Sequence, residues 1–451
     1  MSKTIWQPRL SKGPVPVYRG IADAIERDIS AGVLHEGSRL PTHRKLAQHL
    51  GVTTLTITRA YGEAARRGLI ESTVGKGTFV RATQRSEERR PLDLSRNIIH
   101  GGEDLELGRE LLPELRRWLR SGEYQSPASG SARHKAAGAT WMSRTGLNVP
   151  TDRVVVFPGA QHALLVMFRT LVDPGGFVMC EPMAYPALRP LLDLLRLGVK
   201  TIAMDGEGIQ PRAFDRVCKS SGSKVLYCVP TFQNPTAAVM SEGRRREIAN
   251  VAKKHGVTIL EDDCYAFLTH VPPIASFLPE QTCYITSTSK SMSPSLRIGF
   301  VAAPASLVSR FEATLYATVT FTSTIAAETF TTLLESGEAD RVVAKKRELV
   351  AHHQRIARKV FGERMAATHP ASPHIWLELG EEWDAQEFAQ QAAARGVSVA
   401  PASLFALERR GVPNAIRISL GATQSAAELQ AGLTMLNEMR PESRVPAAAM
   451  V

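Results

Sequence analysis

The sequence predicts an α/β protein of two parts, a small helical domain with a β-wing followed by a large domain built on a mostly parallel sheet. The first observation is length, because 451 residues exceed one ordinary core. The second is charge: residues 1–90 hold 16 Lys and Arg against 8 Asp and Glu, so +8 of the net +11 lies there. The third is that short β-rich runs, such as Val154–Phe157, alternate after residue 91 with helical stretches, such as 242–255. This alternation is typical of a parallel sheet covered by helices on both faces.

The composition narrows the class of protein. A hydrophobic content of 43% and a charged content of 22% are ordinary for a globular chain. Because no apolar run approaches about 18 residues and the N-terminus lacks the apolar core of a signal peptide, we expect no membrane contact. Five cysteines without a CxxC pair predict a cytoplasmic location and no metal site. The expected divisions are a DNA-binding domain over 1–80, a linker over 81–91, a large domain over 92–440 and a disordered tail over 441–451.

The small domain begins with three predicted helices. Isoleucines recur at i, i+4 and i+8 from Ile21, which gives the first helix one apolar stripe. Thr42 opens the second helix. Thr53 is the expected N-cap of a third helix that runs to about Arg67, and Leu55 is among its expected inward apolar positions.

Polar and basic groups of this domain are available to a polyanion. Thr54, Thr56 and Arg59 are left free on the third helix to enter a groove. Two short strands then surround a Gly-Lys-Gly tip, a wing whose Lys76 can reach phosphate. A basic excess confined to this segment indicates double-stranded DNA as the partner. A small helical domain that binds protein remains the alternative.

This segment resembles the winged helix-turn-helix of the GntR family. The resembling stretches are Gly37–Ala47, Arg59-Ala60-Tyr61 and Gly75–Val80. The resemblance implies that the third helix enters the major groove of operator DNA, while Arg44 and the wing contact its backbone. By the same match, Thr53, Thr56, Lys76 and Gly77 are expected contacts. The family usually has an arginine soon after the position of Thr53, where Thr54 and Leu55 stand here, so we expect a different base preference.

The large domain carries an amine, a carboxylate and a candidate phosphate cradle at the ends of its predicted strands. An aldehyde cofactor needs an amine that can lose its proton when desolvated, and Lys290 is the candidate. A buried carboxylate keeps a pyridine nitrogen protonated, and Asp262 lies at the end of a hydrophobic strand. Gly159 stands between a strand and an apolar helix, where free N–H groups can meet a phosphate. Further candidates are Ser287, Ser289 and Arg297 for the phosphate, Asn234 and Tyr265 for the ring hydroxyl, and Tyr185 for stacking on the ring.

These segments, in this order, resemble the fold-type I aminotransferases over residues 92–440. The resemblance implies a fold-type I aminotransferase-like domain with a smaller C-terminal α+β subdomain. It assigns Lys290 to the covalent bond with the cofactor and Arg417 to the α-carboxylate of an amino acid. It also assigns Asp262 to the ring nitrogen, Asn234 and Tyr265 to the ring oxygen, and Ala160, Gln161, Ser287, Ser289 and Arg297 to the phosphate. Pro158 and Ala237 depart from the usual serine and glycine of the family, but neither removes a reacting group.

A GntR-like reader fused to an aminotransferase-like domain resembles the MocR subfamily of transcription regulators. The resemblance implies a domain-swapped homodimer that binds pyridoxal phosphate and operator DNA. It further implies a response to an amine or amino-acid effector through transaldimination at Lys290. Two alternatives stay open: a working aminotransferase, capable of half-transamination or racemisation, that carries a DNA-binding domain, and a sensor of the cofactor itself.

Overall fold

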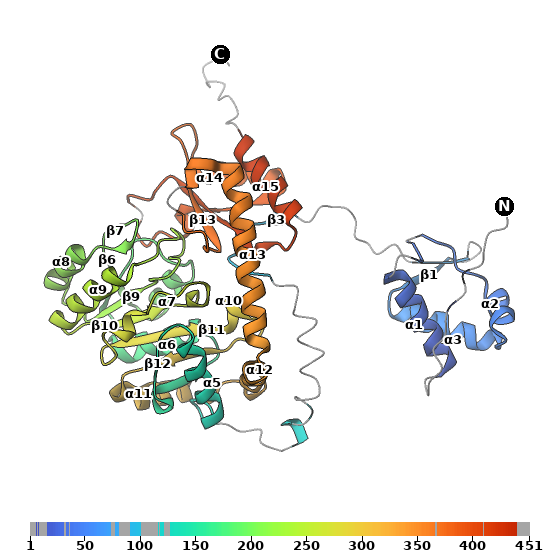
Figure 1. The fold of residues 1–451 in the computed structure, drawn as a ribbon, viewed down its shortest axis with the longest axis horizontal. Helices are drawn as coiled ribbons and strands as arrows, with labels where there is room; N and C mark the ends of the chain where they lie inside the picture. The colour runs from blue at the N-terminus through green and yellow to red at the C-terminus, as the bar shows by residue number, and fades with distance from the viewer. Residues whose placement is uncertain are drawn as a thin grey trace, which may run out of the picture. The chain divides into compact units, whose positions relative to one another are not determined.

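The computed structural model divides into two compact units, residues 1–90 and residues 91–451 (Figure 1). It describes residues 16–30, 33–35, 37–73, 77–80, 91–100, 118–120, 127–365, 368–408 and 410–439, with Trp6, Pro8 and Arg116. The wing-tip Lys76, the linker residues 81–90 and the tail over 441–451 therefore lie outside the described residues.

The N-terminal unit is a three-helix domain with a two-stranded wing. Its elements are α1 (Val17–Ser30), α2 (His43–Leu50), α3 (Thr54–Arg66), β1 (Ile70–Thr73) and β2 (Gly77–Val80). The two strands pair antiparallel. The predicted N-cap Thr53 is confirmed, because it accepts a hydrogen bond from Thr56 N, and Thr42, where the second helix was expected to open, caps α2 by accepting one from Lys45 N. The chain therefore turns from α2 into α3 with both helix starts capped.

The core of this unit lies between α1 and α3. Ile21, Ile25, Ile57 and Ala60 are completely buried there. The prediction for Leu55 was wrong, since 62% of its surface is exposed. Two residues along a helix correspond to a rotation of about 200°, so a side chain two positions before Ile57 points away from the core.

The larger unit is built on a seven-stranded sheet in the order β4-β12-β11-β10-β9-β5-β6. The strands are β4 (Val154–Phe157), β5 (Phe177–Cys180), β6 (Gly198–Thr201), β9 (Val225–Cys228), β10 (Thr258–Asp262), β11 (Thr282–Ser287) and β12 (Gly299–Ala302). β12 runs antiparallel to both of its neighbours and the other pairs are parallel. The prediction of a mostly parallel sheet is confirmed.

Helices cover both faces of this sheet, because alternate strand residues are buried in different clusters. Val155 and Phe157 pack with α6 (Ala160–Leu171), α7 (Leu188–Leu194) and α11 (Ala305–Val319). Val154 and Val156 pack on the opposite face with α5 (Ala132–Ser143), α12 (Thr324–Glu335) and the start of α13 (Glu338–Phe361). The helices α8 (Pro211–Ser221) and α9 (Glu242–His255) cover the β9–β10 part of the sheet.

A smaller α+β portion follows, and α13 runs from the large sheet into it (Figure 1). Its three-stranded antiparallel sheet has the order β13-β16-β15, and β14 pairs in parallel with β3 from the start of the unit. Its elements are β3 (Leu92–Asp93), β13 (His374–Glu378), α14 (Ala385–Ala394), β14 (Val397–Ser398), β15 (Ala400–Pro401), β16 (Ala415–Ser419) and α15 (Ala426–Glu438). Short elements complete the unit: β7 (Met204–Asp205), β8 (Gly208–Ile209), α10 (Thr288–Ser291) and 3-10 turns at Thr151–Arg153, Ala266–Leu268, Ile274–Ser276, Gly362–Met365, Ala402–Leu404 and Leu420–Ala422.

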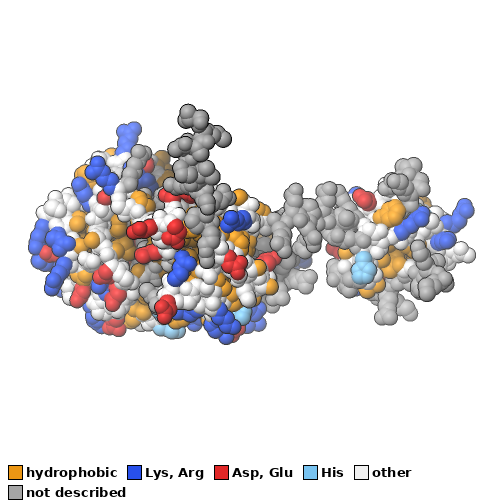
Figure 2. Space-filling model, turned by 90° about the horizontal axis from the view of Figure 1, so that it is seen from above, with side chains coloured by type: hydrophobic (Ala, Val, Ile, Leu, Met, Phe, Trp, Pro, Cys, Tyr) orange, Lys and Arg blue, Asp and Glu red, His pale blue; other side chains and the backbone are white. Residues whose placement is uncertain are grey.

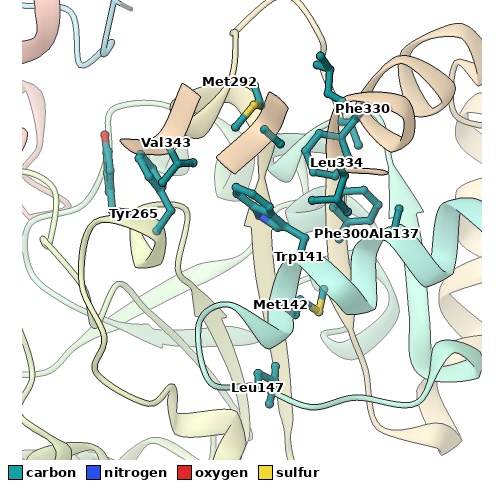
Figure 3. Close-up of a cluster of buried hydrophobic side chains, with 14 of the residues drawn as sticks. Ala137, Trp141, Met142, Leu147, Tyr265, Met292, Phe300, Phe330, Leu334 and Val343 are labelled. Carbon is teal, nitrogen blue, oxygen red and sulfur yellow. The ribbon is translucent and has the colours of Figure 1, made fainter. Parts of the chain in front are cut away.

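A hydrophobic cluster anchors two segments that border the site. Tyr265 and Met292 belong to one buried cluster with Trp141 of α5, Phe330 of α12 and Val343 of α13 (Figure 3). Met292 follows directly on α10, the helix that carries the predicted cofactor lysine. The packing of the large unit therefore fixes the segments on which the pocket residues stand. No helix among the described residues is long and apolar enough to span a membrane.

Candidate functional site

A pocket of about 210 Å³ lies where β4, β9, β10 and β11 end, at the carboxyl edge of the sheet. Ligands bind at this edge in open α/β sheets. Ten predicted residues line it together: Ala160, Gln161, Tyr185, Asn234, Asp262, Tyr265, Ser287, Ser289, Lys290 and Arg297. Leu164, Tyr227, Val229 and Cys264 complete the lining.

Strand β10 sends one carboxylate of an acidic run into the pocket. Asp262 lies two residues after Leu260 on the strand, so both side chains point to the same face of the sheet. Leu260 packs on that face toward α6 and α7. Glu261 and Asp263 point to the other face, where the Arg245 guanidinium lies 3.8 Å from a carboxylate oxygen of each. The alternation of side chains along a strand thus separates three adjacent acids.

Asp262 is held by a neutral donor. Its Oδ2 accepts a hydrogen bond of 3.0 Å from the hydroxyl of the fully buried Tyr227. Burial raises the pKa of Asp262 above its usual range, because hydrogen bonds from neutral groups do not compensate fully for lost hydration. A cation bound in the pocket would compensate for it, and a protonated pyridine nitrogen is such a cation.

The pKa of the Lys290 amine is lower than that of an ordinary lysine. Burial lowers the pKa of Lys290 to about 8, and the charges of Arg417 and Arg297 contribute to the lowering. The Nζ donates to the backbone carbonyl of Asn97. A neutral amine is the nucleophilic form, so this setting suits attack on an aldehyde.

A cradle for an anion lies at the start of α6. Gly159, at the N-cap position with φ 89°, has the Arg297 guanidinium beside it, and a Cβ there would lie 2.8 Å from Arg297 Nη2. A Cβ on Gly299 would in turn lie 2.9 Å from the Gly159 carbonyl carbon. Arg297 Nη1 also donates to Ser289 Oγ at 3.4 Å. The guanidinium and the positive end of the helix therefore face the same place, as a phosphate requires.

Arg417 lies behind the pocket wall rather than in it. It is 3% exposed, and its Nη1 donates to Asn234 Oδ1 at 2.8 Å while Nη2 donates to the Ser95 carbonyl. Its guanidinium carbon lies 4.8 Å from the centre of the Phe405 ring. Burial lowers the pKa of Arg417 to about 10. The arginine thus reaches the pocket through Asn234.

Two buried polar atoms of the site lack a hydrogen-bond partner of normal geometry within the described part of the chain. They are the Tyr265 hydroxyl and Arg417 Nε. Buried polar groups are normally satisfied, so Arg417 Nε calls for a ligand atom, while the Tyr265 hydroxyl has the Asn97 side chain beside it and can bind a ligand as well. The hydroxyl of a pyridoxal ring and a carboxylate are groups that would satisfy them. The residues present therefore fit pyridoxal phosphate.

The outer wall of the pocket is formed by Tyr185 and Gln161. The Tyr185 hydroxyl donates to Gln161 Oε1 at 2.7 Å, and its ring centre lies 6.4 Å from that of Tyr227. On the inner side, the thiol of Cys264 lies 3.4 Å from Ser287 Oγ. The half-buried ring of Tyr185 remains available to lie over a ligand ring.

Arg245 clamps the loop that carries Asn234. Completely buried, it donates to the carbonyl of Met240 at 3.1 Å and to Thr231 Oγ1 at 2.8 Å. A third hydrogen bond of 3.3 Å goes to the carbonyl of Pro230. The guanidinium thus holds both ends of the loop, which positions Asn234 against the pocket.

Sequence reasoning missed Tyr227, Cys264 and the contacts of Ser95 and Asn97. Tyr227 offered a signal, because a tyrosine inside an apolar strand must find a partner for its hydroxyl. Ser95 and Asn97 offered none, since they accept hydrogen bonds with backbone carbonyls, which every residue has.

The predicted DNA contacts of the N-terminal unit lie on α2, α3 and the wing. Arg44, Thr54 and Arg59 are exposed. The Thr53 hydroxyl is engaged as the cap of α3 and lies 2.9 Å from that of Thr56. In the face shown in Figure 2, blue Lys and Arg side chains lie on this unit beside red and pale-blue ones, and the larger unit also shows both signs.

The structure explains why glycine stands at position 77 of the wing. Its φ is 117°, and a Cβ there would lie 2.8 Å from Nε of Arg39. Glycine therefore allows the Arg39 side chain to lie across the base of the wing. Elsewhere in the described residues, no group of three or more His, Cys, Asp or Glu could hold a metal ion.

The fold of the larger unit is that of the fold-type I aminotransferases. It matches the Pyrococcus horikoshii kynurenine aminotransferase with a TM-score of 0.70 at 22% identity, over 78% of this chain and 91% of that one. Residues 119–436 match the aminotransferase class I and II family, to which the chain belongs, and residues 17–80 match the gntR family of bacterial regulatory proteins.

Curated relatives match this chain along most of its length. The uncharacterized HTH-type transcriptional regulator YdeF of Bacillus subtilis is 29% identical over 450 residues, which cover 96% of each chain. The probable rhizopine catabolism regulatory protein MocR of Rhizobium meliloti is 25% identical over 380 residues, 76% of each chain. The chain thus joins a GntR helix-turn-helix domain to an aminotransferase-like domain, as predicted.

Proposed function

We propose that this protein is a pyridoxal-phosphate-dependent transcription regulator that binds operator DNA and responds to an amine or amino-acid effector. The observation that carries the proposal is the pocket, which joins an amine of lowered pKa, a buried carboxylate and an anion cradle. When bound, pyridoxal phosphate supplies an aldehyde that can pass between the Lys290 amine and an effector amine by transaldimination.

Each residue has a proposed part in holding the cofactor. Asp262, held in place by Tyr227, accepts a hydrogen bond from the protonated ring nitrogen and so keeps that nitrogen protonated. Asn234 and Tyr265 hydrogen-bond the ring oxygen. Tyr185 covers one face of the ring. Ala160, Gln161, Ser287, Ser289 and Arg297 bind the phosphate. Arg417, which lies behind Asn234 with its Nε unpaired among the described residues, binds an effector carboxylate that reaches past Asn234.

The segment 91–100 supports a route from the pocket to the DNA-binding domain. Lys290 Nζ donates to the carbonyl of Asn97, and Arg417 Nη2 donates to the carbonyl of Ser95. The covalent bond of Lys290 to the cofactor removes the first donor, and transaldimination by an effector returns it, while an effector carboxylate on Arg417 competes for the second. Because the residues that lead to the DNA-binding domain come directly before this segment, loosening it changes how that domain is tethered.

A second copy of the chain is part of the proposal. Apolar side chains at the end of α11 and the start of α12 are exposed: Tyr316 (64%), Val319 (37%), Phe321 (37%) and Ile325 (47%). Single exposed apolar residues are ordinary, but four within ten residues of the chain favour a covered surface. We expect a homodimer, in keeping with two half-sites on operator DNA. Light scattering should give a monomer mass for Tyr316→Glu and a dimer mass for the native chain.

The test of the proposed function combines spectra with DNA binding. The purified protein with added cofactor should show an absorption band that borohydride fixes, absent in Lys290→Ala and retained in the exposed-surface control Lys200→Ala. An effector amine that shifts the band should change operator affinity about 5- to 150-fold, corresponding to a coupling of about 1–3 kcal/mol. Operator affinity that stays constant with every amine that shifts the band would contradict the proposal.

A working aminotransferase is the second candidate, favoured by the presence of Lys290, Asp262 and Arg417 in one region. Repeated turnover of an amino acid with an oxo acid at about 1–10³ per second would identify an enzyme. A sensor of the cofactor itself would instead change operator affinity on cofactor addition alone.

A further inference from the structure

Helix α3 presents an apolar side chain to solvent in its first turn. Leu55 is 62% exposed, in contrast to the completely buried Ile57 two positions on. Leu55, Arg59 and Gly62 stand at i, i+4 and i+7, so they share one face of the helix, and all three are exposed. This face therefore carries one isobutyl group, one guanidinium and one position without a side chain.

Gly62 supports close approach of a partner to this face. Glycine inside a helix is unfavourable relative to alanine. A Cβ at Gly62 would meet nothing within 4 Å, so packing among the described residues does not require glycine there. A surface approaching α3 from outside gains that space.

The hydroxyls of Thr53, Thr56 and Thr58 are engaged within the helix. Thr53 Oγ1 accepts from Thr56 N and contacts Thr56 Oγ1 at 2.9 Å. Thr58 Oγ1 donates to the Thr54 carbonyl at 3.0 Å. Donation from the Thr58 hydroxyl to a base edge would require breaking its contact with the Thr54 carbonyl. A contact of the apolar Leu55 side chain with DNA would break no hydrogen bond of α3.

We propose that Leu55 reads a thymine in each operator half-site by contact with its 5-methyl group. The inference rests on the proposed function, in which α3 enters the major groove. The first residues of a recognition helix are the ones that reach base edges. In the major groove the thymine methyl is the apolar group that distinguishes one base pair from another. Arg59, one turn further along the same face, adds a contact to a neighbouring base or phosphate.

The experiment removes single methyl groups from the DNA. Operators are first selected from a random duplex library with the full-length protein. Each thymine is then replaced by deoxyuridine, which lacks only the methyl, and affinity is measured by fluorescence anisotropy at one fixed salt concentration. We expect about a fourfold loss for one thymine in each half-site, the value for one buried methyl-sized group.

Variants connect that loss to the side chain. Leu55→Ala should bind the thymine and deoxyuridine operators equally, whereas the native chain distinguishes them. Leu194→Ala is the matched control, because Leu194 is 70% exposed on α7 of the other unit, and it should keep the native fourfold difference. Thermal unfolding of both variants should match the native chain, as expected for surface substitutions.

Three results would overturn the inference. Tight operator binding that tolerates deoxyuridine at every thymine would show that no methyl is read, the outcome expected if Leu55 instead contacts protein. A methyl dependence that persists in Leu55→Ala would assign the contact to another side chain. Failure to select any preferred sequence would contradict the proposed DNA-binding function as well, and is thereby distinguishable from the first two.

Discussion

Replacing Tyr227 by Phe removes one hydroxyl from the pocket and leaves the ring that fills its place. Tyr227 is completely buried, and its hydroxyl donates to Asp262 Oδ2 at 3.0 Å. A hydrogen bond to a charged acceptor contributes about 1.5–3 kcal/mol, and one to a neutral acceptor about 0.5–1.5 kcal/mol. We expect Tyr227→Phe to lower the free energy of unfolding of the cofactor-free protein by the larger amount when Asp262 is ionised.

The cost of this substitution should depend on pH. Burial raises the pKa of Asp262 in the folded state, and the Tyr227 hydroxyl acts against that rise. Removing the hydroxyl therefore raises the folded-state pKa of Asp262 further. At low pH the carboxyl is protonated in both the folded and unfolded states, and only a neutral hydrogen bond is lost. As pH rises through the folded-state pKa, the stability difference between native chain and variant should widen.

Tyr284→Phe is the matched control. Tyr284 is also completely buried, on the neighbouring strand β11, but its hydroxyl lies 3.1 Å from the neutral Thr145 Oγ1. Its removal should cost about 0.5–1.5 kcal/mol with little change between about pH 4 and pH 8. Urea unfolding followed by tryptophan fluorescence reports on the larger unit, since four of the five tryptophans lie after residue 91. Equal, pH-independent costs for the two variants would refute the reasoning.

Three further predictions concern the same region. Because the pKa of Lys290 is about 8, the rate of cofactor attachment should rise about tenfold per pH unit below pH 8 and level off above it in stopped-flow absorbance; a flat profile would contradict this. Gly159→Ala should weaken cofactor binding, measured by titration of the absorption band, because its Cβ would lie 2.8 Å from a guanidinium nitrogen. Gly222→Ala, which has a positive φ but nothing within 4 Å, should retain native affinity. Arg245→Met should lower the free energy of unfolding by about 3–5 kcal/mol, since two buried carboxylates lose their cation, whereas exposed Arg246→Met should cost about 1 kcal/mol or less.

Much of the fold could be predicted because the patterns behind it are local. Apolar residues at helical spacing indicated α3, and Thr53 marked its start as the structure has it. The stretch 242–255 was predicted as a helix and is α9. Strand β4 coincides with the predicted run Val154–Phe157. Capping, periodicity and turn residues act within a few positions of each other, so one sequence is enough to read them.

The error at Leu55 shows where local reading ends. A leucine counts as apolar in the sequence whether its side chain is buried or exposed. The helical spacing of apolar residues in α3 fits with Leu55 included and also with Leu55 left out. Ile57, Ala60 and Ala64 of α3 form the face that packs in the core with α1. Because that face is fixed by the contact with α1, the Leu55 side chain points to solvent.

The sequence by itself determined the chemistry of the pocket: which residue supplies an amine, which a carboxylate, and which an anion cradle at a helix start. Only the tertiary structure decided that Asp262 faces the pocket while its acidic neighbours face Arg245, and that Tyr227 holds it. It also decided that Lys290 and Arg417 both donate to backbone carbonyls of the segment 91–100. The physical reason is that side-chain chemistry belongs to each residue, whereas strand register and burial arise from contacts between residues far apart in the chain.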